Sequence, residues 1–275
     1  MTTAKVIAMC NHKGGVGKTV TTNCLGICLA QEGKKVLMID FDPQGNLTKG
    51  LGFRNKDLYQ YTIKEAIFDE LNESRHPWEE YVTPVTDNAY LIPANISFAG
   101  LDLQLAGMMS RETVFRRVLE QFKPHFDYIL VDSTPTMSLY TINTLTAADS
   151  LIIPVQAEPY ATDGLEDLMH TINIAKRQLN PNLSIEGILL TMTDSRTNLS
   201  KHISNQIHQV FGNSVRVYKT EIPRSVKTAE ASLYDESPIL HAPKSSSAQA
   251  YHNFAKEVIN NGEGFTKSSY KQPVR

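Results

Sequence analysis

Residues 13–19 read KGGVGKT, between a short apolar run, Lys5 to Cys10, and a helical run, Val20 to Gln31. A strand, a glycine-rich turn and a helix in this order predict a phosphate-binding loop. Glycines let successive backbone N–H groups converge on phosphate oxygens at a helix N-terminus. Lys18 and Thr19 supply the GK[ST] end of this loop. We expect Lys18 to reach the β- and γ-phosphates of a nucleotide and the Thr19 hydroxyl to bind Mg²⁺.

The loop departs from the general GxxxxGK pattern at two positions. The upstream glycine of that pattern is replaced by His12, and a second lysine, Lys13, follows it. Gly14, Gly15 and Gly17 remain and still allow the backbone to wrap tightly around a phosphate. These two differences therefore predict a different kind of phosphate loop, whose backbone N–H groups can still bind a phosphate.

Continuous apolar runs alternate with helical stretches along the rest of the chain. The predicted strands are Lys5 to Cys10, Lys35 to Asp40, Asp127 to Asp132, Ser150 to Val155 and Ile185 to Met192. Strands of this kind are typical of a parallel sheet covered by helices on both faces, so we predict an α/β fold with a doubly wound, mostly parallel sheet. Such sheets bind ligands at the carboxyl ends of their strands, where Asp40, Asp42 and Asp132 fall.

The length of 275 residues suffices for one sizeable α/β domain and is short for two. We expect a single P-loop domain over residues 1–260 and a polar, flexible tail over residues 261–275. Residues 50–86 carry the weakest pattern and are expected to form a helical excursion at the surface.

The cysteines and the charges indicate where the protein works. The three cysteines have no metal-type spacing and are expected to be buried core thiols. Their odd number, with no signal peptide and no long apolar run, predicts a cytoplasmic protein. Residues 196–275 carry 11 Lys and Arg against 6 Asp and Glu, whereas the remainder carries 16 against 23. A basic C-terminal third on an acidic body points weakly to a polyanionic partner.

With its second lysine, KGGVGKT resembles the deviant Walker A motif of the ParA/MinD family of P-loop ATPases. MIDFDPQGN (38–46) and YILVDSTP (128–135) are similar to two further motifs of that family, although its Walker B strand is more often followed by two prolines. Residues 141–168, 189–200 and 222–232 resemble ParA and Soj partition proteins in register. The resemblance covers roughly residues 5–260.

The resemblance implies a role for each site residue. Lys13 would cross a dimer interface to the phosphates of the other subunit's ATP, as an arginine finger does. Asp42 would position the attacking water, Asp132 would hold Mg²⁺ together with Thr19, and Asp40 would lie near the metal. Adenine would lie near Pro223 and Ser225, where the family commonly has Asn at the second position. The phosphate-binding residues would be Lys13, Gly14, Gly15, Val16, Gly17, Lys18, Thr19 and Val20.

The resemblance also implies partners. Soj-like members bind nonspecific double-stranded DNA as ATP-dependent homodimers, through positions that match Arg196 and Lys227, and Arg224 could extend this patch. Because a dimer doubles the phosphate contacts, dimerisation alone could strengthen weak DNA binding. A ParB-like centromere-binding protein is the expected stimulating partner, and the ATP-bound protein would associate with the nucleoid. The expected reaction is slow, Mg²⁺-dependent hydrolysis of ATP in the partitioning of a plasmid, chromosome or mobile element.

Other members of the family define the alternatives. A MinD-like membrane ATPase needs a basic amphipathic C-terminal helix, and FTKSSYKQPVR lacks a usable apolar face, so no membrane partner is expected. Relatives of the nitrogenase iron protein need central cluster cysteines, and none follows Cys28. A tyrosine-kinase relative would carry a tyrosine cluster where only Tyr270 is present. A cargo-positioning ATPase that does not bind DNA stays open.

Overall fold

The computed structural model describes residues 3–261, so all but the first residue of the predicted tail, 261–275, lies outside the described residues. Its centre is a seven-stranded sheet in the order β3-β4-β2-β5-β1-β6-β7. Every neighbouring pair is parallel except β3 and β4. The predicted α/β fold with a mostly parallel sheet is therefore confirmed. The strands are β1 Lys5–Met9, β2 Val36–Phe41, β3 Thr83–Pro84, β4 Ala89–Ile92, β5 Tyr128–Ser133, β6 Ser150–Gln156 and β7 Ser184–Thr191.

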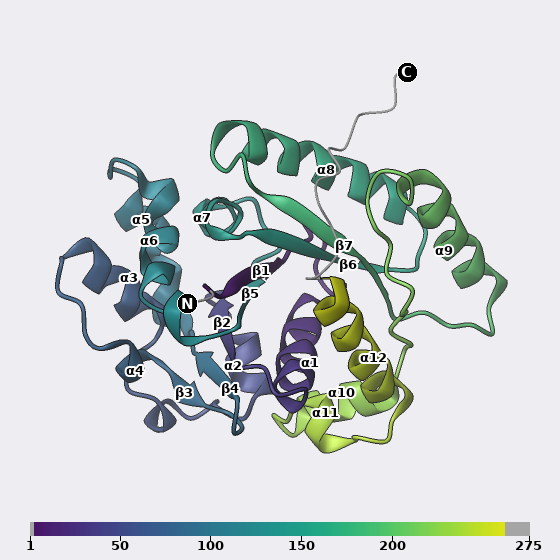
Figure 1. The fold of residues 1–275 in the computed structure, drawn as a ribbon, viewed down its shortest axis with the longest axis horizontal. Coiled ribbons are helices and arrows are strands. Elements are labelled where there is room, and N and C mark those ends of the chain that lie inside the picture. Colours follow the sequence, from purple (N-terminus) through teal and green to yellow (C-terminus); the bar gives the residue numbers. More distant parts are fainter. Residues whose placement is uncertain (1–2, 262–275) are drawn as a thin grey trace.

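Helices cover both faces of this sheet (Figure 1). The α-helices are α1 Lys18–Gln31, α2 Asn46–Gly50, α3 Ile63–Leu71, α4 Trp78–Tyr81, α5 Leu101–Leu105, α6 Val114–Glu120, α7 Leu139–Ala147, α8 Ala161–Gln178, α9 Asn198–Phe211, α10 Val226–Leu233, α11 Pro238–His241 and α12 Ser246–Asn261. Short 3₁₀ helices are η1 Lys56–Leu58, η2 Ile96–Gly100, η3 Arg111–Thr113 and η4 Lys123–His125. Residues 50–86, which were expected to form a helical excursion, contain η1, α3 and α4.

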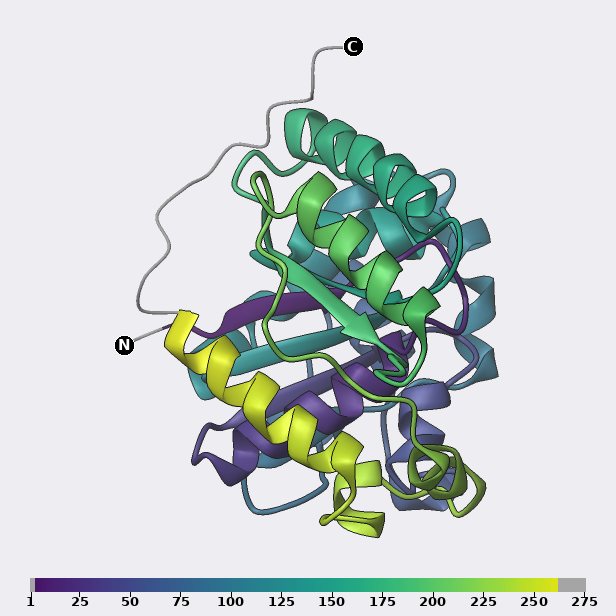
Figure 2. The same cartoon turned by 90° about the vertical axis from the view of Figure 1, so that its right-hand side faces the viewer.

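Side chains of β1 alternate between two buried layers. Val6 and Ala8 belong to the core under α3, α6, α7, α8 and α9, whereas Ile7 and Met9 belong to the core under α1 and α12. Figure 2 shows α1 and α12 side by side on the second face. A strand that is buried on both faces is apolar at most positions, which is why the central strands β1, β2, β5 and β6 appear in the sequence as nearly continuous apolar runs, with acids only near the ends of β2 and β5.

The parallel register aligns the carboxyl ends of the central strands. Asp132 of β5 pairs with Met9 of β1 on one side and with Asp40 of β2 on the other. The loop that follows β1 and the acids that end β2 and β5 therefore meet at one edge of the sheet.

All three cysteines are free and buried, as predicted. Burial raises the pKa of Cys10 and that of Cys28 to about 12. These thiols therefore stay protonated at neutral pH and act as small apolar core groups. In the part of the chain that the structure describes, no helix has the length and apolarity needed to cross a bilayer.

Candidate nucleotide-binding site

The phosphate loop occupies residues 10–17, between β1 and α1. Gly15 and Gly17 have φ angles of 75° and 92°, a left-handed conformation that only glycine adopts readily. Gly17 is the N-cap of α1 and has no side chain to cap the helix. The first backbone N–H groups of this 14-residue helix therefore have no partner within the helix and point toward the loop. A helix N-terminus of this kind favours an anion.

The Lys18 side chain folds back over the loop that precedes it. Its Nζ donates hydrogen bonds to the carbonyls of Asn11 (2.9 Å) and Lys13 (3.0 Å). Burial lowers the Lys18 pKa, and the negative charges of Asp132 and Asp42 raise it. The structure thus brings Lys18 within electrostatic reach of both acids, at the carboxyl edge of the sheet.

Lys13 leaves the loop in the other direction. Its side chain is 57% exposed, and its ammonium forms an ion pair with the Glu158 carboxylate. The Lys13 backbone is fixed, because its N–H donates to Asn11 Oδ1 (3.0 Å) and Asn11 Nδ2 donates to the Pro154 carbonyl in β6 (2.8 Å). Lys13 therefore has a fixed backbone and a largely exposed side chain, whose ammonium is paired with Glu158.

Sequence reasoning missed two residues that brace this loop, Asn11 and Glu158. Asn11 is a polar residue directly between a strand and a glycine-rich turn, so its position was a usable signal. Glu158 follows the strand predicted at Ser150 to Val155, at the strand end where ligands gather, but nothing local indicates its partner. A third brace is Thr191 of β7, whose hydroxyl donates to the Val16 carbonyl (2.8 Å).

Asp40 is fully buried near the end of β2, and both of its carboxylate oxygens accept hydrogen bonds. Its Oδ2 accepts hydrogen bonds from the Thr48 N–H (2.8 Å) and the Thr48 hydroxyl (2.7 Å), and its Oδ1 accepts one from the Asp42 N–H (3.3 Å). Burial raises the Asp40 pKa to about 6, and the hydrogen bonds from Thr48 oppose that increase. Asp40 therefore holds α2 against the sheet and has less free coordinating capacity than Asp132.

Asp132 presents an unsatisfied oxygen. Among the described residues, nothing donates to its buried Oδ1. Burial raises the Asp132 pKa well above the usual range, the charge of Asp40 raises it further, and a hydrogen bond from Thr19 lowers it. A buried carboxylate with a free oxygen, next to a second carboxylate and a threonine hydroxyl, is a suitable place for a cation.

The residues present fit Mg²⁺ better than a metal that needs a complete protein cage. In residues 3–261, no group of three or more His, Cys, Asp or Glu side chains is arranged to hold a metal ion. Mg²⁺ is typically held by one or two protein ligands, with phosphates and water completing its octahedron. Thr19 and Asp132 match such a partial set.

Asp42 lies in the turn between β2 and α2. Its Oδ1 accepts a hydrogen bond from the Gln44 N–H (2.9 Å), and its carbonyl accepts one from the Gly45 N–H (2.9 Å). The half-buried Asp42 side chain is near enough to Lys18 and Asp132 to shift the pKa of each. The structure thus places Asp42, Lys18, Thr19 and Asp132 around one position.

The loop after Asp132 replaces prolines with hydroxyl groups. The Ser133 hydroxyl donates to the Met9 carbonyl in β1 (2.6 Å). The Thr134 and Thr141 hydroxyls lie 3.2 Å apart, and the Thr141 hydroxyl also donates to the Thr136 carbonyl (2.6 Å). This network fixes the path of the chain from the carboxyl edge of the sheet to α7, so the departure from two prolines still leaves a braced loop.

Pro223 and Ser225 lie on a segment that runs beside the end of β7. Thr193 and Pro223 form a parallel bridge, and the Arg224 N–H donates to the Thr193 carbonyl (3.0 Å). The end of β7 also contacts the phosphate loop, because Thr191 bonds to Val16. Ser225 is the residue before α10 and makes no side-chain capping bond. Both residues predicted near adenine are therefore at the same edge of the sheet as the loop.

The three predicted DNA contacts are exposed, and two of them are paired with acids. The Arg196 side chain, 87% exposed, binds Asp194 through two nitrogens (2.9 and 2.8 Å). These hydrogen bonds lower the Asp194 pKa to about 2, with a smaller contribution from the charge of Arg224. Lys227 pairs with Glu230 (2.6 Å) on α10. Arg196 is thus paired with Asp194, and Lys227 lies in the first turn of the following helix.

Comparisons with known proteins agree with this geometry. The model of a family described as "AAA domain" matches residues 4–185. The sporulation initiation inhibitor protein Soj of Bacillus subtilis is 43% identical over 258 residues, which cover 94% of this chain and 99% of that protein. The chromosome partitioning protein ParA of Myxococcus xanthus is 37% identical over 260 residues, covering 94% and 89%.

Among solved structures, a cobyrinic acid a,c-diamide synthase from Mycobacterium smegmatis with bound ADP and magnesium is similar to this chain. Its TM-score is 0.81 at 30% identity, and the match covers 98% of this chain and 100% of that one. The likeness therefore extends over the whole fold, and that relative binds a nucleotide with magnesium.

Proposed function

This chain belongs to the ParA/Soj-like family of partition ATPases, and from that premise we propose that it is a switch driven by ATP. In this proposal, ATP binding favours a homodimer that holds nonspecific double-stranded DNA, and slow hydrolysis returns the protein to monomers. The observation that carries the proposal is the arrangement of Lys18, Thr19, Asp42 and Asp132 around one position at the N-terminus of α1.

The phosphate loop binds the nucleotide. The backbone from Gly14 to Val20 and the Lys18 ammonium hold the phosphates. To do so, Lys18 gives up its hydrogen bonds to two backbone carbonyls and binds phosphate oxygens instead. Thr19 and Asp132 would hold Mg²⁺, with Asp40 behind them as a buried support. The ion would neutralise charge on the phosphates and polarise the bond to be broken. Pro223 and Ser225 border the adenine.

Asp42 acts on the attacking water. A carboxylate beside the γ-phosphate can hold a water in line for attack without being a strong base. Asp42 already accepts a hydrogen bond from the Gln44 backbone through one oxygen, which fixes the carboxylate and leaves the other oxygen for the water. Removing this group should impair the chemical step and spare ATP binding.

Lys13 completes the site of the other subunit. It is largely exposed and bound to Glu158, so reaching a second nucleotide requires only the exchange of a surface ion pair, an interaction of roughly 0–1 kcal/mol. A cation supplied in trans stabilises the charge of the transferring phosphoryl group. Hydrolysis would therefore require the dimer.

DNA binding uses the exposed cations beside this edge, Arg196, Arg224 and Lys227. Each phosphate contact releases counterions, so the affinity should fall steeply with salt. We place the ATP-bound protein on the nucleoid and the free protein in the cytoplasm, with a ParB-like protein as the partner that stimulates hydrolysis. An ATPase that positions other cargo without binding DNA is the alternative.

The substitution Asp42→Ala tests the catalytic assignment. We expect ATP affinity to stay within about twofold of wild type, while ATP turnover falls by about 100-fold or more, because one water-positioning group is lost. Titration with a fluorescent ATP analogue and a phosphate-release assay measure the two quantities. Asp57→Ala, at an exposed position in η1, is the matched control. Loss of ATP binding in the Asp42 variant would contradict the assigned role.

A further inference from the structure

Asn23 lies on α1, the helix that begins at Lys18, and its side chain reaches across to α2. Its Nδ2 donates a hydrogen bond to the carbonyl of Gly50, the last residue of α2 (2.9 Å). Asn23 is only 3% exposed, and in the part of the chain that the structure describes its buried Oδ1 accepts no hydrogen bond. No role proposed above uses this side chain.

Two kinds of contact hold α2 in place. Leu47 is fully buried in the core under α1, but an apolar contact has no preferred direction, so it does not fix the position of a short helix. Hydrogen bonds do fix it. Thr48 donates to Asp40 of β2, and Asn23 of α1 donates to Gly50. Thr48 therefore sets the position of α2 relative to the sheet, and Asn23 sets it relative to α1.

The helices α1 and α2 carry two halves of the proposed site. Lys18 and Thr19 begin α1, whereas Asp42 lies in the turn that runs directly into α2. This turn is bonded within itself, because the Gln44 N–H donates to Asp42 Oδ1 and the Gly45 N–H donates to the Asp42 carbonyl (2.9 Å each). The turn should therefore move together with α2. A shift of α2 along α1 would change the distance between Asp42 and the phosphate loop.

The Asn23 amide is costly at this position. A buried acceptor without a donor loses its hydration and gains no bond in return. The opposite orientation of the amide gives no relief, because it would turn Oδ1 toward the Gly50 carbonyl, a second acceptor. A leucine of similar size would avoid this cost. Residues that break a local rule in this way are expected at positions that serve function in addition to stability.

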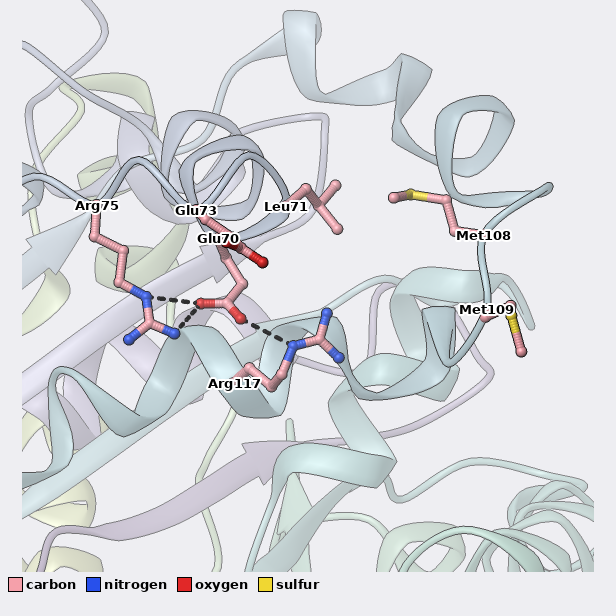
Figure 3. A pocket seen from close by; sticks show the side chains of 7 residues that line it. All are labelled: Glu70, Leu71, Glu73, Arg75, Met108, Met109 and Arg117. Atoms are coloured by element: carbon pink, nitrogen blue, oxygen red, sulfur yellow. Dashed lines mark hydrogen bonds and ion pairs between the residues drawn. The ribbon is translucent and has the colours of Figure 1, made fainter.

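The contact between α3 and α6 shows how a satisfied polar connection differs. Beside the open groove of Figure 3, the buried carboxylate of Glu70 on α3 accepts hydrogen bonds from Arg75 Nε and, through its other oxygen, from Arg117 Nε on α6 (2.9 Å each). Both carboxylate oxygens are thus bonded. Asn23 instead makes one hydrogen bond and leaves a buried oxygen without one.

We propose that Asn23 is a positioning residue for ATP hydrolysis, because its hydrogen bond to Gly50 fixes α2 on α1 and thereby places Asp42 relative to the phosphate loop. The effect on turnover rests on the proposed ATPase function, whereas the effect on α2 rests only on the hydrogen bond. Asn23 is buried and lies outside the residues proposed to bind the nucleotide. Its loss should therefore slow the chemical step, which is sensitive to small displacements, and spare ATP binding.

The substitution Asn23→Leu keeps the size of the side chain and removes the donor. We expect ATP turnover, measured by phosphate release, to fall by about tenfold, while the affinity for a fluorescent ATP analogue stays within about twofold. The urea midpoint should not fall, because the unsatisfied oxygen is removed together with the hydrogen bond. Asn23→Ala, which cannot overpack, should show the same loss of turnover if leucine prevents folding.

Tyr251→Phe is the matched control. The Tyr251 hydroxyl lies 3.1 Å from the Thr21 hydroxyl, so this change removes a buried polar contact between the same helix, α1, and a different neighbour, α12. Turnover should change by less than about twofold, because α2 is not involved. An equal loss of turnover in Tyr251→Phe and Asn23→Leu would assign the effect to a general loosening of α1 and overturn the proposal.

A double substitution tests whether Asn23 acts through Asp42. In the Asp42→Ala background, Asn23→Leu should lower the remaining turnover by less than about twofold, because the group that Asn23 positions is already absent. A tenfold loss in both backgrounds would mean that Asn23 acts on another part of the site. A loss of ATP affinity that parallels the loss of turnover would mean that it acts on binding. Either result would overturn the proposed role.

Amide NMR of the protein without nucleotide reports on the turn directly. The signals of Gln44 and Gly45 should shift in Asn23→Leu and stay in place in Tyr251→Phe. Unchanged signals in Asn23→Leu would show that the hydrogen bond to Gly50 does not position the turn. If the wild-type chain failed to hydrolyse ATP, this comparison would still report on α2, so the positioning by Asn23 and the proposed ATPase function fail separately.

Discussion

At the scale of single residues, Asp194 has two roles that one substitution separates. It accepts the Arg196 N–H at 3.0 Å, which shapes the turn before α9, and it neutralises the Arg196 guanidinium. In the proposed switch, this negative charge lies beside the cations that meet DNA phosphates. Asp194 should therefore limit DNA affinity in addition to ordering the turn.

Asp194→Asn keeps an oxygen to accept the Arg196 N–H and removes the charge. We expect the affinity of the ATP-bound protein for plain duplex DNA to rise by about 3- to 10-fold at low salt, because two repelling charges per dimer are lost. The gain should disappear at about 0.5 M salt. Fluorescence anisotropy measures this, with Asp163→Asn on the exposed side of α8 as control. Weaker binding would instead mean that Asp194 orients Arg196 for DNA.

Individual site residues differ in how far the sequence predicts them. The glycines, Lys18 and Thr19 are readable because a tight anion-binding turn before a helix restricts residue types locally. The pairing of Lys13 with Glu158 is not readable, because it joins positions 145 residues apart. For the same reason, the sequence places Asp40 and Asp132 at one edge of the sheet but does not indicate their hydrogen bonds. Thr48 donates to Asp40, whereas Oδ1 of Asp132 accepts no hydrogen bond from the described residues.

At the scale of elements, the entry into α2 connects the fold to the turn that carries Asp42. Gly45 precedes α2 with a φ angle of 62°, and a Cβ atom there would lie 2.8 Å from the Ala94 carbonyl oxygen. That oxygen belongs to backbone, which cannot swing aside. Asp42 and Thr48 flank this point, so a displaced α2 would disturb both Asp42, which is proposed to position water, and the hydrogen bonds from Thr48 to the buried Asp40.

Gly45→Ala should lower the free energy of unfolding by about 1–3 kcal/mol, from the left-handed backbone and the close contact. Urea unfolding followed by circular dichroism measures the change. Gly107→Ala is the control, because its added Cβ would meet nothing within 4 Å and its backbone is not left-handed. An unchanged urea midpoint in the Gly45 variant would show that α2 can shift freely.

Elements also differ in predictability. The five strands predicted from the sequence are found with bounds shifted by one residue at most at either end, because burial on both faces requires continuous apolar residues. The strand β4, Ala89–Ile92, was not predicted, since four residues are too few to establish a period. The two-residue β3 leaves even less trace and is defined by its pairing with β4.

At the scale of the whole molecule, the basic side chains are concentrated in the C-terminal third of the chain. Arg196, predicted to contact DNA, precedes α9, and Lys227, predicted to do the same, lies at the start of α10. The excess of bases is likewise confined to residues 196–275.

The central claim is that ATP, not ADP, makes this protein a dimer that holds DNA. Sedimentation velocity of Asp42→Ala with Mg-ATP, Mg-ADP or no nucleotide, repeated with plain duplex DNA at two salt concentrations, tests it most directly. We predict a dimer with Mg-ATP alone, which carries DNA at low salt and releases it at high salt. The same dimer should form without retaining DNA when Arg196→Glu and Lys227→Glu are added. A monomer in all three nucleotide conditions would contradict the switch, and an ATP-bound dimer that ignores DNA at low salt would contradict its coupling to DNA.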